Sequence, residues 1–347
     1  MPRRVVINKA GGVSAIAVQS MDMPEPGKDE VRIRVVFAGI NFADLLMRMG
    51  FYNPRPPYPF TPGYEVSGYV DALGPGVTSF TIGQRVVAAM RNGGQASHVT
   101  CETSRIITIP DTISLESAAA TPVVYLTAHH MLHYLGHMNT DHSVLIHGGA
   151  GGVGIAALQL CKWAGVEKVW ATSSAPKHEI IKQYGARAID RHNENFVDII
   201  RKDTNGRGVD HVLDPIGGEH LKRSLSVVAE GGRLYTYGLS AAAPTSKRSL
   251  LKALFAMRKT PKFDPLRLMT RNRSVFGVHM GTWSDEGVMQ TQLDRILKGI
   301  EDGNLNPTVD SIFPAEKVQD AHQYIHDAKN IGKVLLQFSQ DDGGAVQ

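Results

Sequence analysis

The sequence has only two cysteines among its 347 residues, Cys101 and Cys161, and it has no C-x-x-C motif. Thiols this scarce exclude a disulfide framework and a thiolate-rich metal site, and they are typical of a reducing compartment. No apolar run approaches the roughly 18 residues that a membrane span needs. The opening MPRRVVINKAGG also lacks the apolar segment of a secretory signal. These absences predict a cytoplasmic protein.

An excess of one charge is also missing, because 37 Lys and Arg residues face 33 Asp and Glu residues, for a net charge of +4. No basic run is interleaved with aromatic residues in the way that single-strand-binding proteins require. We therefore expect no nucleic-acid partner. The composition is otherwise that of an ordinary globular protein, and the length suits two domains.

The clearest motif follows an apolar segment at Ser143–His147, which has the length and branched content of a strand. A glycine run comes next, then an Ala- and Leu-rich helical stretch at 155–163, and then a second apolar segment. Strand, glycine turn, helix and strand form the unit that binds a dinucleotide. The spacing Gly149-x-Gly151-x-x-Gly154 allows a tight turn, close approach of a pyrophosphate and packing of the helix on the strand. The alternative interpretation is a glycine-rich structural turn.

The chain on either side of this motif divides into two patterns. Residues 1–120 alternate short β-segments with turn signals, which predicts a small antiparallel barrel. From Thr140 strands and helices alternate, which predicts a parallel sheet with helices on both faces. A closing strand at Lys333–Phe338 would rejoin the first pattern. The expected domains are therefore a barrel domain at 1–122 and 284–347 and a nucleotide-binding domain at 123–283.

The expected elements follow from these patterns. The strands are Arg3–Asn8, Ala15–Ser20, Glu30–Ala38, Glu65–Ala72, Arg85–Ala89, Ser97–Cys101, Ser143–His147, Lys168–Ser173, Ala188–Asp190, His211–Asp214, Arg233–Tyr237 and Lys333–Phe338. The helices are Ser114–Ala120, 121–135, Ile155–Ala164, Pro176–Tyr184, Phe196–Thr204, Glu219–Val228, Met289–Asp302 and Pro314–Ala328.

Several stretches together carry a family resemblance. They are GINFADLLMRMGFY at 39–52, PFTPGYEVSGYV at 59–70, IGQRV at 82–86, TPVVYLTAHHML at 121–132, the glycine unit, VDHVLDPIGG at 209–218 and IGKVLL at 331–336. In this order they resemble the zinc-free quinone oxidoreductase (zeta-crystallin-like) branch of the medium-chain dehydrogenase/reductase superfamily. Residues 247–281 most resemble its vesicle amine transport protein group. The resemblance implies an α/β protein with a GroES-like β-barrel domain and a doubly wound Rossmann domain, and a homodimer.

No metal is expected. Zinc alcohol dehydrogenases of the superfamily carry a cysteine and a histidine where this chain has Asn41 and Tyr64, which are poor zinc ligands. The four-cysteine structural lobe is also missing. His129, His133 and His137 are spaced so that a helix would align them, but a polar helix face is the simpler interpretation.

The resemblance places Asn41, Asp44 and Tyr52 on one segment at the nicotinamide pocket. Asn41 would orient a carbonyl group, whereas Asp44 is equally suited to capping the helix that begins there. Tyr52 and Tyr64 are candidate phenolic donors, or they line the pocket. The expected catalytic residues are Asn41, Tyr52 and Tyr64.

Cofactor choice depends on the end of the second strand of the nucleotide-binding domain. NAD enzymes place an acidic residue there, whereas this chain has Ser173, Ser174 and Lys177. Arg191 also suits a 2′-phosphate, so NADPH is the expected cofactor; the alternative is that both cations are solvated surface residues. The expected cofactor-binding residues are Thr127, Gly149, Gly151, Gly152, Val153, Gly154, Ser173, Ser174, Lys177, Arg191 and Gly238.

Residues 247–273 hold nine Lys and Arg residues and one acid, Asp264, with leucines and other apolar residues near helical spacing. A basic amphipathic helix is typical of weak peripheral contact with an anionic membrane surface. The alternative is a helical cover over the substrate cleft, with its charges in solvent.

Two functions remain at this point. The first is an NADPH-dependent reductase that transfers hydride to a quinone or an α,β-unsaturated carbonyl compound without zinc. The second is a catalytically weak NADPH-binding protein that acts at a membrane or lipid surface. Because function depends on the site and not on the fold, the resemblance alone does not separate them.

Overall fold

The structure is a computed structural model that describes residues 1–341, and the chain folds into two compact units. The sequence boundaries at 122/123 and 283/284 each differ by one residue from those of the units. A short segment assigned from the sequence to the nucleotide-binding domain packs with the other unit. Unit 1 comprises Met1–Val123, Thr245–Arg248 and Trp283–Gln347, and unit 2 comprises Val124–Pro244 and Ser249–Thr282.

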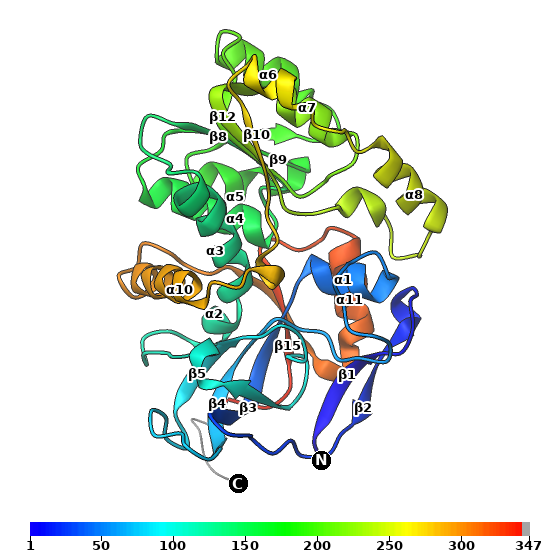
Figure 1. Ribbon diagram of the computed structural model, residues 1–347, viewed down its shortest axis with the longest axis vertical. Helices are drawn as coiled ribbons and strands as arrows, with labels where there is room; N and C mark the ends of the chain where they lie inside the picture. Colours follow the sequence, from blue (N-terminus) through cyan, green and yellow to red (C-terminus); the bar gives the residue numbers. More distant parts are fainter. Residues whose placement is uncertain (342–347) are drawn as a thin grey trace. The chain divides into compact units, whose positions relative to one another are not determined.

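Unit 1 is built mainly of antiparallel strands (Figure 1). Its strands are β1 (Arg3–Ile7), β2 (Ile16–Ser20), β3 (Glu30–Ile40), β4 (Glu65–Leu73), β5 (Arg85–Ala89), β6 (His98–Glu102), β7 (Ile106–Thr108), β14 (Val309–Pro314) and β15 (Lys333–Gln337). Its helices are α1 (Phe42–Met49), α2 (Leu115–Ala119), α10 (Glu286–Glu301) and α11 (Val318–His326), and α3 (Pro122–His129) begins in this unit.

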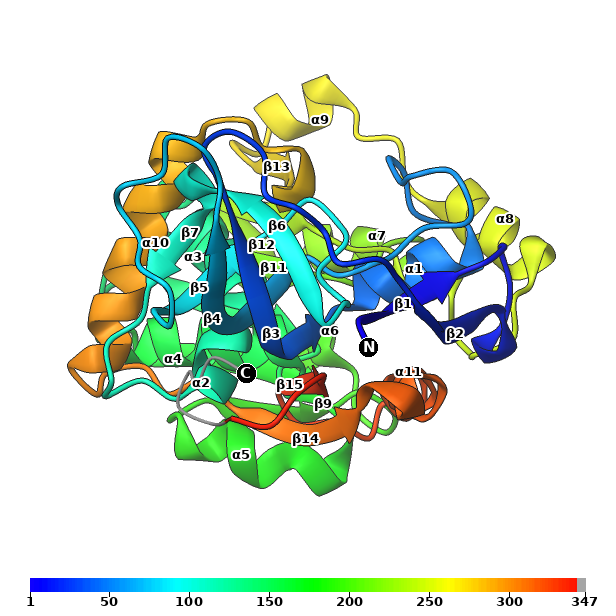
Figure 2. The same cartoon turned by 90° about the horizontal axis from the view of Figure 1, so that it is seen from below.

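Seven strands form the main sheet of unit 1, in the order β14-β15-β3-β4-β5-β7 with β6 paired to β3. Strand β3 organises it, because Val31, Ile33 and Val35 alternate with half-buried residues and are fully buried. Strand β15 runs antiparallel to β3, with Val334 opposite Ile40. Figure 2 shows α10 and α11 on opposite sides of this sheet.

Helix α1 is fixed to α11 by a buried arginine. Arg48 is fully buried, and its guanidinium contacts His322 Nδ1 at 3.1 Å and His326 Nε2 at 2.8 Å. Burial lowers the pKa of Arg48 to about 10 and that of His326 to about 4, and it holds the pKa of His322 well below its usual value. Both histidines are therefore neutral near pH 7 and accept from the arginine.

Unit 2 is a doubly wound α/β unit. Its six strands are all parallel, in the order β10-β9-β8-β11-β12-β13. The strands are β8 (Ser143–His147), β9 (Lys168–Ser173), β10 (Arg187–Asp190), β11 (Val209–Asp214), β12 (Val228–Thr236) and β13 (Ser274–Gly277). The helices are the rest of α3, α4 (Gly152–Trp163), α5 (His178–Gln183), α6 (Phe196–Asp203), α7 (His220–Ser226), α8 (Leu250–Lys259) and α9 (Pro265–Met269).

Helices cover both faces of the unit 2 sheet: α4 and α5 lie on one side, and α6 and α7 on the other (Figure 1). Every residue of β8 is buried, as expected of a central parallel strand. The strand order reverses between β8 and β11. In such sheets, ligands bind at the carboxyl ends of the strands where this reversal occurs.

Candidate functional site

The glycine turn lies at the carboxyl end of β8 and leads into α4. A Cβ atom on Gly154 would lie 2.4 Å from the Gly148 carbonyl oxygen, and one on Gly149 would lie 2.6 Å from Ala171 Cβ. Both glycines are therefore required by packing. Gly151 differs, because its Cβ would meet only the Gly148 oxygen, at 3.3 Å. The space beside Gly151 is thus left open at the start of the helix.

The first turn of α4 also lacks a side-chain cap. Gly151 is the N-cap residue and has no side chain to accept the free N–H groups, and no acidic residue lies in the first turn. These N–H groups and the helix dipole favour an anion. The arrangement at Gly151, Gly152 and Val153, which are partly exposed, therefore fits a pyrophosphate group.

The residues expected to select the cofactor lie at the ends of β9 and β10. Ser173 is the final residue of β9 and Ser174 follows it. Lys177 lies three residues beyond, at the end of a short turn, and is half-buried. The Arg191 N–H donates to the Ser173 carbonyl at 2.9 Å, so Arg191 lies beside them, with an exposed side chain. The structure thus brings two hydroxyl groups and two cations to adjoining strand ends.

Two further expected cofactor residues occupy separate places in unit 2. Thr127 lies on α3 and is buried. Gly238 follows β12, and a Cβ there would lie 2.5 Å from the Pro215 carbonyl oxygen. Gly238 therefore lets the ends of β12 and β11 approach, which is a packing requirement in its own right.

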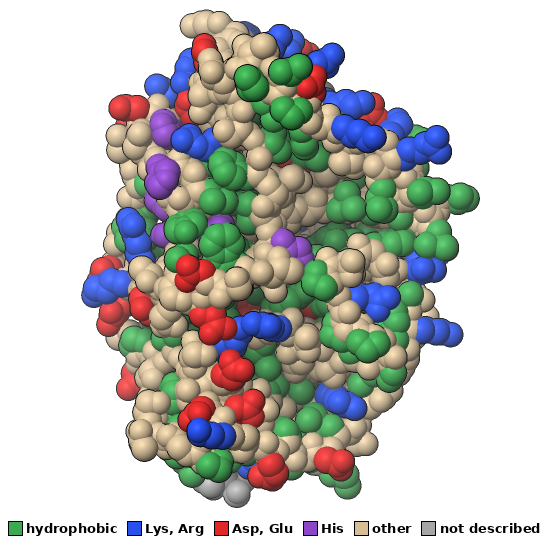
Figure 3. Space-filling view, viewed as in Figure 1, with side chains coloured by type: hydrophobic (Ala, Val, Ile, Leu, Met, Phe, Trp, Pro, Cys, Tyr) green, Lys and Arg blue, Asp and Glu red, His purple; other side chains and the backbone are tan. Residues whose placement is uncertain are grey.

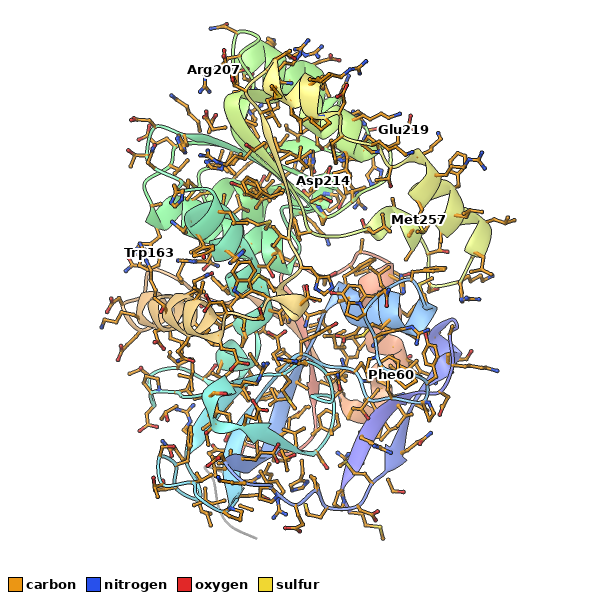
Figure 4. The ribbon with its side chains drawn as sticks, in the orientation of Figure 1. Phe60, Trp163, Arg207, Asp214, Glu219 and Met257 are labelled. Carbon is orange, nitrogen blue, oxygen red and sulfur yellow. The ribbon has the colours of Figure 1, made fainter. Side chains whose placement is uncertain are left out.

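The sequence did not indicate a buried hydrogen-bond network that lies at the ends of β8 and β11. Asp214 Oδ2 accepts from Ser224 Oγ at 2.6 Å and lies 2.7 Å from His220 Nδ1, and Oδ1 accepts from the N–H groups of Ile216 and Gly217. Although burial opposes it, these contacts lower the pKa of Asp214 to about 2. Asp214 is labelled in Figure 4.

His147 completes the network from the end of β8. Its Nδ1 lies 3.1 Å from Thr172 Oγ1 and its Nε2 lies 3.2 Å from Ser224 Oγ. Burial lowers the pKa of His147 to about 3, so the imidazole is neutral. Among residues 1–341, His147, Asp214 and His220 form the only three-residue group with metal-ligand spacing. However, Asp214 is hydrogen-bonded to His220, and Ser224 lies within hydrogen-bonding distance of all three. Their contacts are those of a structural hydrogen-bond network.

In unit 1, Asn41 is the N-cap residue of α1 and is nearly buried. Asp44 serves the same helix end: its carboxylate accepts from the Asn41 N–H at 2.8 Å and from the Gly63 N–H at 3.2 Å. Burial raises the pKa of Asp44 to about 7, against the lowering effect of these donors. The contacts of Asp44 match the capping interpretation.

The two candidate phenols lie together. Tyr52 and Tyr64 share a hydrogen bond, and Tyr64 also contacts Met47 Sδ at 3.7 Å. Burial raises the pKa of both tyrosines, and the nearby Asp44 adds to the rise. Both phenols therefore stay protonated near neutral pH.

Two charged residues that contact the Asn41 side chain were also not predicted from the sequence. Glu65 from β4 is fully buried, and Lys333 from β15 is 3% exposed. Lys333 Nζ donates to Asn41 Oδ1 at 2.6 Å and forms an ion pair with Glu65, while Asn41 Nδ2 donates to Glu65 Oε1 at 2.9 Å. Both residues fall within stretches that carry the family resemblance, but no local pattern marks them as partners.

Comparison with known proteins agrees with this architecture. Residues 27–126 match the family described as "Alcohol dehydrogenase GroES-like domain", and residues 184–336 match "Zinc-binding dehydrogenase". The chain is 38% identical to the Rattus norvegicus "Synaptic vesicle membrane protein VAT-1 homolog", over 96% of this chain and 83% of that protein.

Two solved structures are similar over nearly the whole chain. One is the CurK enoyl reductase, with a TM-score of 0.84, 26% identity and coverage of 97% of this chain and 99% of that one. The other is the Escherichia coli quinone oxidoreductase complexed with NADPH, with a TM-score of 0.85, 25% identity and coverage of 97% and 100%.

The zinc of the second family description does not fit the residues at Asn41 and Tyr64. Catalytic zinc takes thiolate, imidazole or carboxylate ligands. Here the Asn41 amide oxygen accepts from the Lys333 ammonium, and Tyr64 is a protonated phenol. An ammonium group at the amide oxygen would repel a metal ion, so no step of the chemistry is derived through zinc.

Proposed function

Because the chain belongs to the quinone oxidoreductase and VAT-1 branch of the medium-chain dehydrogenase/reductase superfamily, we propose that it is a zinc-independent reductase. Its cofactor is NADPH, and its acceptor is a quinone or an α,β-unsaturated carbonyl compound. The observation that carries the proposal is the uncapped glycine turn before α4, with hydroxyl and cationic side chains at the neighbouring strand ends.

The cofactor part rests on unit 2. Free N–H groups at the start of α4 suit the pyrophosphate, and the opening beside Gly151 leaves room for it. Ser173, Ser174, Lys177 and Arg191 suit the 2′-phosphate, since no acidic residue ends β9 to hold a free 2′-hydroxyl. The solved relative complexed with NADPH supports the same cofactor.

The acceptor part rests on unit 1. When bound, NADPH supplies the hydride. Hydride addition to a conjugated acceptor gives a delocalised enolate or hydroquinone anion, which hydrogen-bond donors stabilise. Asn41 offers an amide N–H, and Tyr52 and Tyr64 offer protonated phenols. Without a metal to polarise an isolated ketone, a conjugated acceptor is the better match to these residues.

The test is the consumption of NADPH with a panel of quinones, enones and unconjugated ketones. We expect turnover with quinones or enones and little with unconjugated ketones. Tyr52→Phe should slow turnover by up to about 100-fold, the usual range for one general acid or donor. A protein that binds NADPH tightly and reduces no member of the panel would not be a reductase of this class.

Lys177→Ala is expected to weaken NADPH binding at least tenfold and to leave NADH binding nearly unchanged. The reason is that a charge-assisted bond to the 2′-phosphate contributes about 1.5 to 3 kcal/mol, and NADH lacks that phosphate. Titration calorimetry with each cofactor measures both affinities. Lys182→Ala, a nearby exposed lysine paired with Glu179, is the matched control. Equal losses for both cofactors would assign Lys177 another role.

A second candidate function, contact with an anionic membrane, is favoured by one observation on α8. This helix buries its small residues and exposes its large apolar ones. Ala253 and Ala256 are only 3% and 8% exposed, whereas Leu251 is 81% exposed and Leu254 and Phe255 are 60% exposed. Burying large apolar groups stabilises a helix, so this orientation is unfavourable in water unless something covers it. The α8–α9 surface comprises the exposed residues Leu250, Leu251, Leu254, Phe255, Met257, Leu266 and Met269.

Charge favours an anionic surface over a second copy of the chain. Lys252, Arg258 and Lys262 are exposed on this segment, and no ion pair is found for them among residues 1–341. Two such surfaces would repel each other, whereas anionic lipid would attract both. Figure 3 shows green and blue side chains adjoining over α8, and Figure 4 labels Met257 there. No helix among the described residues is long and apolar enough to cross a bilayer, so contact would be peripheral.

We expect the protein to co-sediment with vesicles that contain phosphatidylserine, and to be released by added salt, because screening weakens surface attraction. Leu254→Gln with Phe255→Gln should reduce binding severalfold without loss of stability. Leu73→Gln with Ile82→Gln, two exposed apolar residues of unit 1, is the control. Binding that ignores salt, or equal binding by both variants, would argue against membrane contact through α8.

A further inference from the structure

Asn41, Glu65 and Lys333 form a closed triangle inside unit 1. Lys333 Nζ bonds Asn41 Oδ1, Asn41 Nδ2 bonds Glu65 Oε1, and Glu65 Oε1 is paired with Lys333 Nζ. The three residues come from the start of α1, from β4 and from β15, and none is more than 8% exposed. This group is therefore assembled by the tertiary fold and not by local sequence.

The surroundings keep Glu65 in place. Its second carboxylate oxygen accepts from the Val123 N–H at 2.8 Å. A Cβ on Gly39 would lie 2.5 Å from Glu65 Oε1 and 2.7 Å from its Cγ, so β3 passes the carboxylate only because residue 39 is glycine. Both oxygens of Glu65 are thus directed by backbone positions, which leaves its side chain little freedom.

A buried ion pair needs an explanation beyond stability. Moving two charges out of water is unfavourable, and two apolar residues of similar size often stabilise a protein as well or better. The triangle does fix the Asn41 amide completely, because an ammonium group binds its oxygen and a carboxylate binds its nitrogen. Flipping the amide would place N–H groups against an ammonium and an oxygen against a carboxylate.

An amide nitrogen has two hydrogens, and Glu65 takes one of them. No second acceptor for Asn41 Nδ2 is found among residues 1–341. The ammonium on the amide oxygen also draws electron density from the nitrogen, which strengthens the remaining N–H as a donor. A fixed, polarised donor of this kind suits an oxygen that becomes negative during reaction.

We infer that Lys333 and Glu65 are positioning residues that hold the Asn41 amide so that its second Nδ2 hydrogen meets the oxyanion of the reduced acceptor. This inference rests on the proposed reductase function. In the balanced step, NADPH gives a hydride to the acceptor and becomes NADP⁺, the acceptor oxygen takes the electron pair, and a tyrosine or water supplies the proton. Lys333 and Glu65 exchange no proton in this scheme.

The test compares single and paired replacements. Lys333→Met alone leaves Glu65 without its cation and should destabilise unit 1. Lys333→Met with Glu65→Gln removes both charges and should recover most of that stability, yet kcat should fall at least tenfold while KM and NADPH affinity change less than twofold. Lys333→Arg, which keeps a cationic donor, should retain most of kcat. Lys298→Met with Glu301→Gln removes an exposed ion pair of the same unit and should change nothing.

A stable paired variant with wild-type kcat would overturn the inference. A readout independent of turnover is hydrogen exchange of the Asn41 side-chain amide, measured by NMR. We expect slow exchange in the wild type and exchange at least tenfold faster in the paired variant. If the wild type reduces no acceptor, the reductase function fails; if exchange is the same in both proteins, the positioning role fails. The two failures are thus distinguishable.

Discussion

Replacing Asp214 with alanine is expected to lower the unfolding free energy of unit 2 by about 3 to 5 kcal/mol, the usual range when one partner of a buried charged network is removed. The carboxylate is fully buried and is contacted by two backbone N–H groups, the Ser224 hydroxyl and the His220 imidazole. Alanine leaves the two backbone N–H groups without an acceptor in a dry interior and removes one partner each from Ser224 and His220, and each loss adds to the desolvation penalty.

The same replacement is also expected to weaken NADPH binding. The network ties the loop after β11 to α7 and, through Ser224 and His147, to the end of β8 where the glycine turn begins. Urea unfolding followed by tryptophan fluorescence and NADPH titration measure the two effects. Asp141→Ala, an exposed carboxylate of the same unit, is the control and should stay within about 0.5 kcal/mol of the wild type. A loss below about 1 kcal/mol for Asp214→Ala would mean that the network contributes little.

Unit 2 is also expected to lose about 4 to 5 kcal/mol of stability between about pH 6.5 and about pH 4.5. His147 and His211 are both fully buried, and the pKa of each is lowered to about 3. Burial is the main cause, and a neighbouring histidine adds to the lowering. Below their ordinary pKa of about 6.5, both are protonated in the unfolded chain and neutral in the folded one. The unfolded state then binds more protons, so stability falls as the pH falls, by about 1.4 kcal/mol per pH unit for each histidine.

The carboxylates of unit 2 do not cancel this slope. The pKa values of Asp210 and Asp214 are lowered to about 2, so both stay ionised in the folded state across the window, and their own contribution is lost only at lower pH. Urea unfolding at several pH values gives the slope. His211→Gln should remove about half of it, whereas His192→Gln, at an exposed histidine, should leave it unchanged. A flat profile for the wild type would show that the buried histidines do not control acid stability.

The sequence predicted the central elements of unit 2 well, because short apolar segments bounded by glycines are locally distinctive. Ser143–His147 and Lys168–Ser173 match β8 and β9 residue for residue. The helix expected at Ile155 begins earlier, at Gly152. Glycine has a weak helix propensity, so the sequence does not mark this first turn as helical. Its free N–H groups nevertheless suit a ligand. Strand β12 begins at Val228 and not at Arg233, since Gly231 and Gly232 interrupt the apolar pattern without ending the strand.

Three strands were not expected at all. β7 (Ile106–Thr108), β13 (Ser274–Gly277) and β14 (Val309–Pro314) are edge strands, only partly buried, and they show little apolar alternation. Their pairing partners make them strands, and this information is not local. The parallel fold class and the return of the closing strand to the first unit came from larger patterns, which tolerate such misses.

The site was predicted less completely, for the same physical reason. The glycines and the two serines at the end of β9 could be identified from the sequence because their spacing is short. Glu65 and Lys333 contact Asn41 only because the fold brings β4 and β15 next to it. Asp214 contacts Ser224 only because α7 packs against β11. A lone buried acid or lysine in a sequence looks like any other charged residue. The roles of Asn41, Tyr52 and Tyr64, the binding of NADPH, the homodimer and the membrane contact remain predictions.

The pairing of β15 with β3 has a consequence for the order in which the protein acquires its structure. Asn41 and Lys333 are 292 positions apart, and the whole of unit 2 is synthesised between them. Unit 2 holds all six strands of its own sheet and can fold as soon as it has left the ribosome, since domains generally fold as units during synthesis. The sheet of unit 1 must wait for β15, and closing so long a loop is slow. Until then, Glu65 lacks its cation, and the centre of unit 1 is the last part of the protein to mature.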